Sequence, residues 1–159
     1  MYTILKEQTG TEIGIGVSEV KKFDWYNQQY QNTKDQKPIN YPAVYFEILD
    51  PQNWESGSNG LQVANMRVKL HIVVFDLNDE PNAVMTLTQK VYQYFNGKSL
   101  FIIDSNTQLT SKWSRVQTEF IKRYNQLKVM TITFNFSYFD SSDEPLLVNA
   151  APVNFIINH

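Results

Sequence analysis

The sequence predicts an α+β domain in which one long helix packs on a mostly antiparallel sheet, preceded by a helix-like N-terminal segment. Two segments, 66–75 and 130–138, alternate apolar and polar residues with the period of two that a half-buried strand shows. Between them, segment 81–96 has apolar residues spaced by three and four positions, the period of an amphipathic helix. Elements in this order fit a helix that covers one side of a sheet.

The chain is long enough for one hydrophobic core. Its 159 residues are 42% hydrophobic and 19% charged, a composition typical of a single soluble domain. Folding at this length buries about 68–70% of the surface of the unfolded chain, so neither a metal ion nor a disulfide is required. We expect one domain over 1–159, with an N-terminal segment 1–40, an α+β core 41–140 and a C-terminal extension 141–159.

The N-terminal segment is expected to begin irregularly and then form a helix. Gly10, Gly14 and Gly16 interrupt any early element because glycine is a poor helix former. Residues 17–32 have a loose apolar side, which predicts a helix there. Residues 33–40 are polar and are predicted to link this helix to the first strand.

Two strands are predicted on either side of a turn-rich loop. The first is 43–49, Ala-Val-Tyr-Phe-Glu-Ile-Leu, whose residues alternate between two faces. The loop, 50–60, concentrates turn-forming residues around Trp54 and is expected to be exposed and mobile. The second strand is 66–75. Its core side is predicted to consist of Met66, Val68, Leu70, Ile72 and Val74, with Arg67, Lys69 and His71 on the opposite side.

The central helix has start and stop signals in the sequence. Pro81 suits a first helical position, and the acidic pair before it lies near the positive end of the helix dipole. Asn96-Gly97 supplies the C-terminal stop. We therefore predict a helix over 81–96. Its apolar side consists of Val84, Leu87, Val91, Tyr94 and Phe95.

The remaining segments are predicted to be strands. Within 98–125, residues 113–120 fit either an alternating strand or a helical turn, and we assign short strands to the whole segment. Residues 130–138 alternate almost ideally and are rich in strand-forming residues. Residues 152–157 predict a short final strand or an arm that pairs with a neighbour.

No catalytic, cofactor or metal site is predicted. Cysteine is absent, and the two histidines, His71 and His159, are not accompanied by a nucleophile motif or by ligands at metal-binding spacing. Gly14-Ile-Gly16 lacks the strand and the third glycine of a dinucleotide-binding turn. The paired carboxylates at 79–80 and 143–144 each precede proline and indicate a helix start and a strand end. We expect no enzyme activity and no cofactor.

Charge and hydropathy favour a soluble protein that binds other proteins. The 14 basic and 16 acidic residues give a net charge of −2, which argues against a protein that coats nucleic acid. The N-terminus lacks the features of a signal peptide, and no stretch reaches the roughly 18 apolar residues of a membrane span. We expect a soluble intracellular product without membrane contact.

The order of elements resembles the tail-completion or tail-terminator proteins of long-tailed bacteriophages. The residues concerned are the strand Pro42-Ala-Val-Tyr-Phe-Glu-Ile, the turn-rich loop, the strand ending Val73-Val-Phe-Asp76, the helix from Ala83 to Phe95 and the strand from Val129 to Asp140. The resemblance covers about residues 38–140. It implies a small α+β virion protein, made in the bacterial host cytoplasm. Such proteins form a hexameric ring at the head-proximal end of the tail, in contact with the tail tube protein and the neck or connector protein.

A ring requires one patch on each subunit to meet a different patch on the next. We place these contacts on a sheet edge and on segment 98–125, since aromatic and arginine residues dominate interface energy. The candidate interface residues are Trp54, Trp113, Arg115, Phe120 and Tyr124, although Trp113 and Phe120 fit a core role equally well. If the ring surrounds passing DNA, the candidate lumen-facing residues are Arg67, Lys69 and His71.

Two alternatives remain open. The first is a different neck or baseplate adaptor, which would use the same kind of surface. The second is a small ligand-binding or enzymatic α+β domain with a pocket under the helix at 81–96.

Overall fold

The computed structural model describes residues 2–31, 40–76, 82–102 and 105–140. The α+β fold predicted from the sequence is confirmed. The elements in chain order are α1 (Tyr2–Gly16), β1 (Lys22–Trp25), the short 3₁₀ helix η1 (Gln29–Gln31), β2 (Ala43–Ser56), the 3₁₀ turn η4 (Ser58–Gly60), β3 (Gln62–Phe75), α2 (Asn82–Phe95), β4 (Phe101–Ile102), β5 (Thr107–Gln108), β6 (Ser114–Tyr124) and β7 (Leu127–Asp140).

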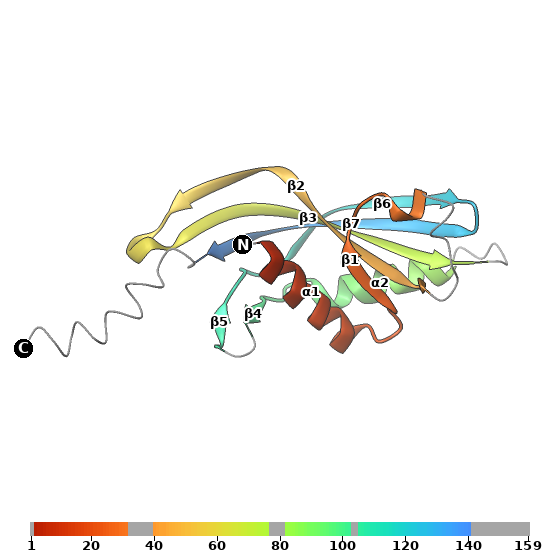
Figure 1. Cartoon of the computed structure of the whole chain (residues 1–159), viewed down its shortest axis with the longest axis horizontal. Coiled ribbons are helices and arrows are strands. Elements are labelled where there is room, and N and C mark those ends of the chain that lie inside the picture. Colours follow the sequence, from red (N-terminus) through yellow and green to blue (C-terminus); the bar gives the residue numbers. More distant parts are fainter. Residues whose placement is uncertain (1, 32–39, 77–81, 103–104, 141–159) are drawn as a thin grey trace, which may run out of the picture.

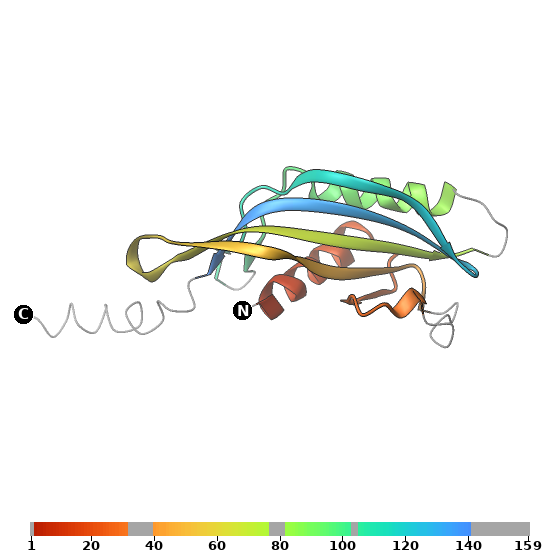
Figure 2. The ribbon, with the colours of Figure 1, turned by 90° about the horizontal axis from the view of Figure 1, so that it is seen from above.

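The main sheet has five strands in the order β1-β2-β3-β7-β6. Strand β1 runs parallel to β2, and the other neighbouring pairs are antiparallel. Both helices cover the same face of this sheet (Figures 1 and 2). The short strands β4 and β5 form a separate ribbon. We call the face under the helices the helix face and the other the open face.

The helix face carries the main core, as the alternation in β3 and β7 predicts. Val68, Leu70 and Ile72 are fully buried, and the register places Leu70 opposite Ile132. Helix α2 confirms the predicted helix, because Val84, Leu87 and Val91 all contribute to this core. The apolar periodicities of the sequence therefore identify the correct side of each of these elements.

A second, smaller core lies on the open face at one end of the sheet. Tyr45 and Val73, which alternation assigns to the outer side, are 1% and 0% exposed. The chain after β1 covers them, since Tyr30 of η1 is buried in the same cluster. This end of the sheet is consequently buried on both faces.

The predicted helix at 17–32 is wrong, and so is the prediction that glycines interrupt the first residues. Helix α1 runs through Gly10, Gly14 and Gly16, whereas 17–32 contains β1 and η1. The glycines allow close packing: a Cβ at Gly10 would lie 2.6 Å from the Phe23 ring, and one at Gly16 would lie 2.0 Å from the Tyr94 ring. Close approach to neighbouring elements outweighs the poor helix propensity of glycine.

The loop predicted at 50–60 is a strand followed by a tight turn, although residues 53 and 55–60 are exposed, as predicted. Strand β2 continues to Ser56 through an irregularity between Leu49 and Asn53, so only a tight turn remains before β3. Trp54 lies in this strand, and its ring meets that of Tyr138 edge-on at 6.2 Å. Pairing with β3 on both sides of this irregularity holds β2 extended despite its turn-forming residues.

Segment 98–125 contains two short strands, as predicted. It also contains one long strand, which the sequence did not predict. Strand β6 has 11 residues and lies at the edge of the sheet. Its register against β7 shifts between Arg115 and Gln117 and again between Glu119 and Lys122. Each shift adds one residue and interrupts the alternation, which is why the sequence predicts short strands here instead of one long strand.

Four sequence predictions lie wholly or mostly outside the described residues. They are the linker at 33–40, the acidic helix start at 79–81, the acidic strand end at 143–144, and the extension 141–159 with its final strand or arm at 152–157.

Candidate functional site

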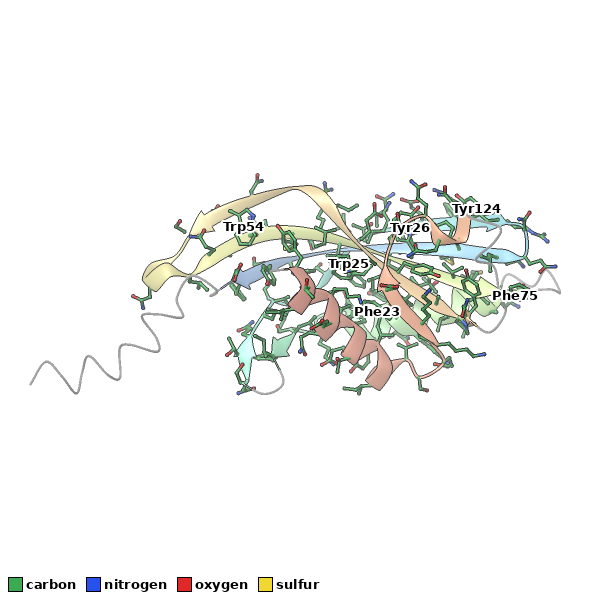
Figure 3. All side chains as sticks on the ribbon, in the orientation of Figure 1. Phe23, Trp25, Tyr26, Trp54, Phe75 and Tyr124 are labelled. Atoms are coloured by element: carbon green, nitrogen blue, oxygen red, sulfur yellow. The ribbon has the colours of Figure 1, made fainter. Side chains whose placement is uncertain are left out.

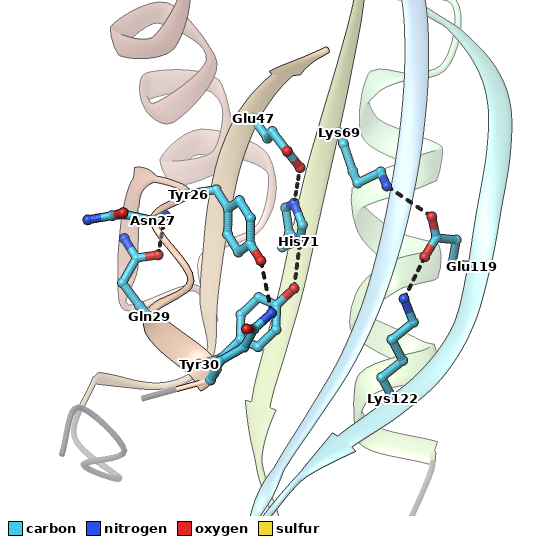
Figure 4. Close-up of polar contacts among 10 residues, drawn as sticks. Tyr26, Asn27, Gln29, Tyr30, Glu47, Lys69, His71, Glu119 and Lys122 are labelled. Atoms are coloured by element: carbon cyan, nitrogen blue, oxygen red, sulfur yellow. Dashed lines mark hydrogen bonds and ion pairs between the residues drawn. The ribbon is translucent and has the colours of Figure 1, made fainter. Parts of the chain in front are cut away.

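A polar network centred on His71 occupies the open face of the sheet (Figure 4). The strand register sets Tyr45, His71, Thr131 and Glu119 in one row across β2, β3, β7 and β6. The Tyr30 hydroxyl lies 2.9 Å from His71 Nδ1, and Glu47 Oε2 lies 2.6 Å from His71 Nε2. The Tyr26 ring stacks on the imidazole with 3.9 Å between the ring centroids. His71 thereby connects two strands to the segment that follows β1.

Burial determines the charge of His71. The side chain is only 4% exposed, and its desolvation lowers the pKa of the imidazole in spite of the hydrogen bond and charge of Glu47, which act to raise it. In the neutral form, Nε2–H donates to the Glu47 carboxylate and Nδ1 accepts from the Tyr30 hydroxyl, so that both ring nitrogens are satisfied. Burial also raises the pKa of the Tyr30 hydroxyl, which therefore remains a donor.

This arrangement predicts that the protein loses stability as the pH falls. Because the folded-state pKa of His71 lies below its ordinary value near 6.5, the unfolded chain binds more protons below about pH 6.5. The contribution of His71 to the free energy of unfolding is therefore complete above that pH and declines on acidification. We expect urea denaturation between about pH 7 and pH 5 to show this decline in the native chain.

The control for this prediction is His71→Gln, which retains His159 and both hydrogen-bonding ends of the side chain. Its free energy of unfolding should vary less with pH over the same interval. Carboxylates with lowered pKa values, such as Glu12 and Glu119, contribute only at lower pH. Equal slopes for the two proteins would show that His71 is not the titrating group.

A second polar group lies beside the first, on β3 and β6. Lys69 Nζ is 2.9 Å from Glu119 Oε1, and Lys122 Nζ is 3.1 Å from Glu119 Oε2. The hydrogen bonds from these two ammonium groups lower the pKa of the Glu119 carboxyl. Glu119 lies between two cations, and the Glu47 carboxylate beside the neutral His71 balances the remaining positive charge. The whole surface is therefore polar without being strongly charged.

A hollow of about 220 Å³ opens between these groups. Its floor includes Thr131, which is 5% exposed and whose hydroxyl has no hydrogen-bond partner among the described residues. Its remaining walls are Tyr26, Tyr30, Gln31, Glu47, Lys69, His71, Glu119, Phe120, Lys122, Tyr124 and Val129. An unsatisfied buried hydroxyl is unfavourable, so the Thr131 hydroxyl is a destabilising feature of this part of the sheet.

Phe120 stands at the rim of this hollow and is 93% exposed. It lies within the second register shift of β6, where the extra residue disturbs the regular alternation of the strand. Val116, at the first shift, is 50% exposed. Two apolar side chains are thus presented to solvent along the edge strand of the sheet.

The structure separates the candidate interface residues that the sequence placed together. Trp113 is 1% exposed and packs between Phe95 and Phe136, with ring centroids at 4.9 and 4.5 Å. The interface prediction is wrong for Trp113, because its ring is enclosed by the core. Arg115 is directed to the helix face, where its guanidinium lies 4.0 Å from the centre of the Tyr92 ring.

The other candidates keep some exposure. Trp54 and Tyr124 are half-buried, and Phe120 is almost fully exposed. Their assignment to an interface stays a prediction.

The three candidate lumen-facing residues share the open face, as alternation predicts, but differ in their surroundings. Arg67 is exposed, Lys69 is half-buried in its contact with Glu119, and His71 is buried. A direct contact of His71 with DNA is contradicted by this burial, because Tyr26 and Tyr30 cover the ring.

The sequence did not indicate Tyr26, Tyr30, Glu47 or Thr131 as members of one site. They lie on three separate parts of the chain, and only the strand register and the covering segment bring them together. The polar alternation of β7 marks Thr131 as outward-facing, but no local signal reveals that its hydroxyl is buried.

Two further observations concern other kinds of site. Within the described ranges, no three His, Asp or Glu side chains gather closely enough to hold a metal ion, and no helix combines the length and apolar character needed to cross a membrane. An open hollow of about 400 Å³ lies beside the first half of α2, between Pro42, Val74 and Leu87.

Comparison with known proteins reveals a shared fold. Neither a protein-family model nor a curated protein sequence matches the chain. Among solved structures, a chain from the "Virion of native gene transfer agent (GTA) particle" superposes with a TM-score of 0.52. The match covers 86% of this chain and 95% of that chain at 10% sequence identity. At this identity the likeness shows the fold alone.

Proposed function

We propose that this chain is a structural protein of a virion, and within that class a tail terminator or tail-completion protein. The observation that supports the proposal most is the fold shared with a chain of a gene transfer agent virion over nearly the whole length of both chains. The order of strands and helix that resembles tail-terminator proteins supports the finer assignment independently. We propose a structural and not an enzymatic role.

In this role the chain forms a closed ring of six copies at the head-proximal end of the tail, made in the bacterial host cytoplasm. One side of the ring binds the tail tube protein and the other the neck or connector protein. Closure requires two different surfaces on each subunit that fit one another. Arg67 is an exposed cation of the open face and would meet passing DNA if this face lines the opening.

Particle imaging and mass determination over a concentration series test this proposal. We expect a ring with a central opening and a mass of roughly 110 kDa, six times the chain mass of 18.6 kDa. The ring is expected either in the purified chain or after addition of tail tubes, at whose ends it should be seen. A chain that remains monomeric with tail tubes present, or that binds only at the distal end, would contradict the tail-terminator role. Binding to neck or baseplate proteins without tail tubes would favour a different adaptor.

A further inference from the structure

Another hollow, of about 500 Å³, lies on the open face where β2, β3 and β7 run side by side. The register places Asn53 of β2 opposite Asn65 of β3, and Arg67 of β3 opposite Asn135 of β7. These four side chains are exposed and line the hollow, together with the exposed Lys112 from the segment before β6. We call it the Arg67 hollow.

The Arg67 hollow is separate from the hollow at His71. Figure 3 shows Trp54, the neighbour of Asn53 in β2, on the other half of the sheet from Tyr26 and Tyr124, which line the hollow at His71. The two hollows have no described lining residue in common. The polar network around His71 therefore does not account for the Arg67 hollow.

The lining of the Arg67 hollow is positively charged. Arg67 and Lys112 are its two cations, and none of its described lining residues is Asp or Glu. No ion pair or side-chain hydrogen bond involves either cation within the described residues. Exposed carboxamides beside them supply further hydrogen-bond donors. Such a surface is suited to bind an anionic group through charge-assisted hydrogen bonds.

Nearby acidic residues do not neutralise these two cations. Glu55 lies one cross-strand row beyond the hollow and offsets one positive charge at most. Glu47 and Glu119 belong to the polar network around His71, where they are already engaged. By alternation along β7, Asp140 is directed to the helix face. Even with Glu55 counted, the described residues leave one positive charge in excess at this hollow.

An acidic pair follows the end of β7 in the sequence. Asp143 and Glu144 come three and four residues after Asp140, the last residue of β7. An extended chain of this length reaches about 10–14 Å. The near wall of the hollow, at Ser137, lies three residues back along β7, which is about 10 Å at the rise of a strand. The pair can therefore reach the hollow of its own subunit, and the turn-forming residues at 140–145 favour the required reversal.

Charge and connection select this pair as the occupant. Asp143 and Glu144 are the only Asp, Glu, Lys or Arg residues in 141–159, and two carboxylates match the two cations of the hollow. The short connection to β7 gives the pair a high effective concentration at the hollow, which an acidic segment of a separate molecule lacks. An occupant from the same chain is therefore favoured over one from another copy.

We propose that the Arg67 hollow binds the acidic pair Asp143-Glu144 of the same chain, with Arg67 and Lys112 as the cations that hold the two carboxylates. The contact fixes the start of the C-terminal extension on the open face. It concerns a single subunit and does not depend on the proposed ring, so its failure would leave the tail-terminator role untouched. If the open face lines the opening of a ring, the bound carboxylates neutralise Arg67 there.

Disulfide formation in the full chain tests the contact, since the native chain has no cysteine. We would combine Ser142→Cys, beside the acidic pair, with Asn65→Cys in the hollow, and equilibrate the chain in a glutathione redox buffer at low ionic strength. We expect an intramolecular disulfide, seen without reductant as a faster-migrating band of a single chain of 18.6 kDa. Disulfide-linked dimers as the main product would overturn the proposal, because the occupant would then come from another copy.

The matched controls remove charge, because a short connection can bring two cysteines together without an ionic contact. In the two-cysteine chain, Arg67→Gln with Lys112→Gln should lower the equilibrium ratio of disulfide to thiol by roughly threefold or more. Asp143→Asn with Glu144→Gln should lower it by a similar factor. Asp50→Asn, within the irregularity of β2, removes an acidic charge elsewhere and should leave it unchanged. A ratio that is independent of Arg67 and Lys112, or that Asp50→Asn lowers equally, would overturn the proposal.

A measurement without cysteines keeps the proposal testable if the two-cysteine chain misfolds. The NMR resonance of the Arg67 side-chain Nε–H should shift when Asp143→Asn and Glu144→Gln are introduced together into the native chain. The same resonance should keep its position in Asp50→Asn. An Arg67 resonance that does not respond to the loss of the acidic pair would contradict the contact.

Discussion

Replacing Trp113 by alanine is expected to lower the free energy of unfolding by about 3–5 kcal/mol, the usual effect of removing a large buried aromatic ring. Its ring is 1% exposed and contacts the rings of Phe95, Phe134 and Phe136. Its indole Nε1–H donates to the Thr110 hydroxyl at 3.0 Å, so the substitution also removes a buried hydrogen bond. Urea denaturation followed by circular dichroism measures the change without relying on tryptophan fluorescence.

Phe120→Ala is the matched control for this prediction. Both residues lie in the same 98–125 segment and both are large aromatics, but Phe120 is 93% exposed. Its substitution should change the free energy of unfolding by less than about 0.5 kcal/mol. A loss of less than about 1 kcal/mol for Trp113→Ala would show that the ring is not enclosed by the core.

The second large effect is expected at Gly16, where an added methyl group has no room. A Cβ there would lie 2.0, 2.1 and 2.4 Å from three atoms of the Tyr94 ring. Tyr94 cannot move freely, because its hydroxyl donates to Glu12 at 2.6 Å and accepts from Lys98. Gly16→Ala should therefore lower the free energy of unfolding by about 1–3 kcal/mol, as overpacking does.

Gly14→Ala provides the control within the same helix. Among the described residues, no atom outside the chain neighbours and the backbone of the helix itself lies within 4 Å of a Cβ at this position, so alanine fits here and improves the helix propensity. We expect an increase of about 0.5–1 kcal/mol in the free energy of unfolding. If both variants were stabilised by a similar amount, α1 would not pack against α2 as described.

Several features of the fold follow from short-range patterns in the sequence. In β3, β7 and α2 the apolar residues repeat with the period of the element, and the side that the pattern marks is the side that packs into the main core. The assignment of Arg67, Lys69 and His71 to a single face is equally a consequence of period two. Each of these patterns lies within a stretch of about ten residues, so it can be recognised without knowing which distant residues the element contacts.

Other features required partners that lie far away in the sequence. The Tyr94 ring leaves room only for glycine at position 16, and β2 stays extended past Leu49 because β3 pairs with it. The same dependence explains why β6 was predicted as short strands and not as one long strand, since its two register shifts are defined only against β7. Local propensity was overridden by packing and pairing in each case.

The candidate site, too, depends partly on local sequence patterns and partly on contacts between distant residues. By itself, the sequence determined an α+β chain with one amphipathic helix, two alternating strands and no recognisable catalytic motif. Tertiary structure alone decided that Trp113 is buried and Phe120 exposed, that His71 lies under two tyrosines, and that the Thr131 hydroxyl is buried without a hydrogen-bond partner in the part of the chain that the structure describes. The physical reason is that burial and hydrogen-bond satisfaction depend on strand register and on covering segments, which join residues up to about a hundred positions apart.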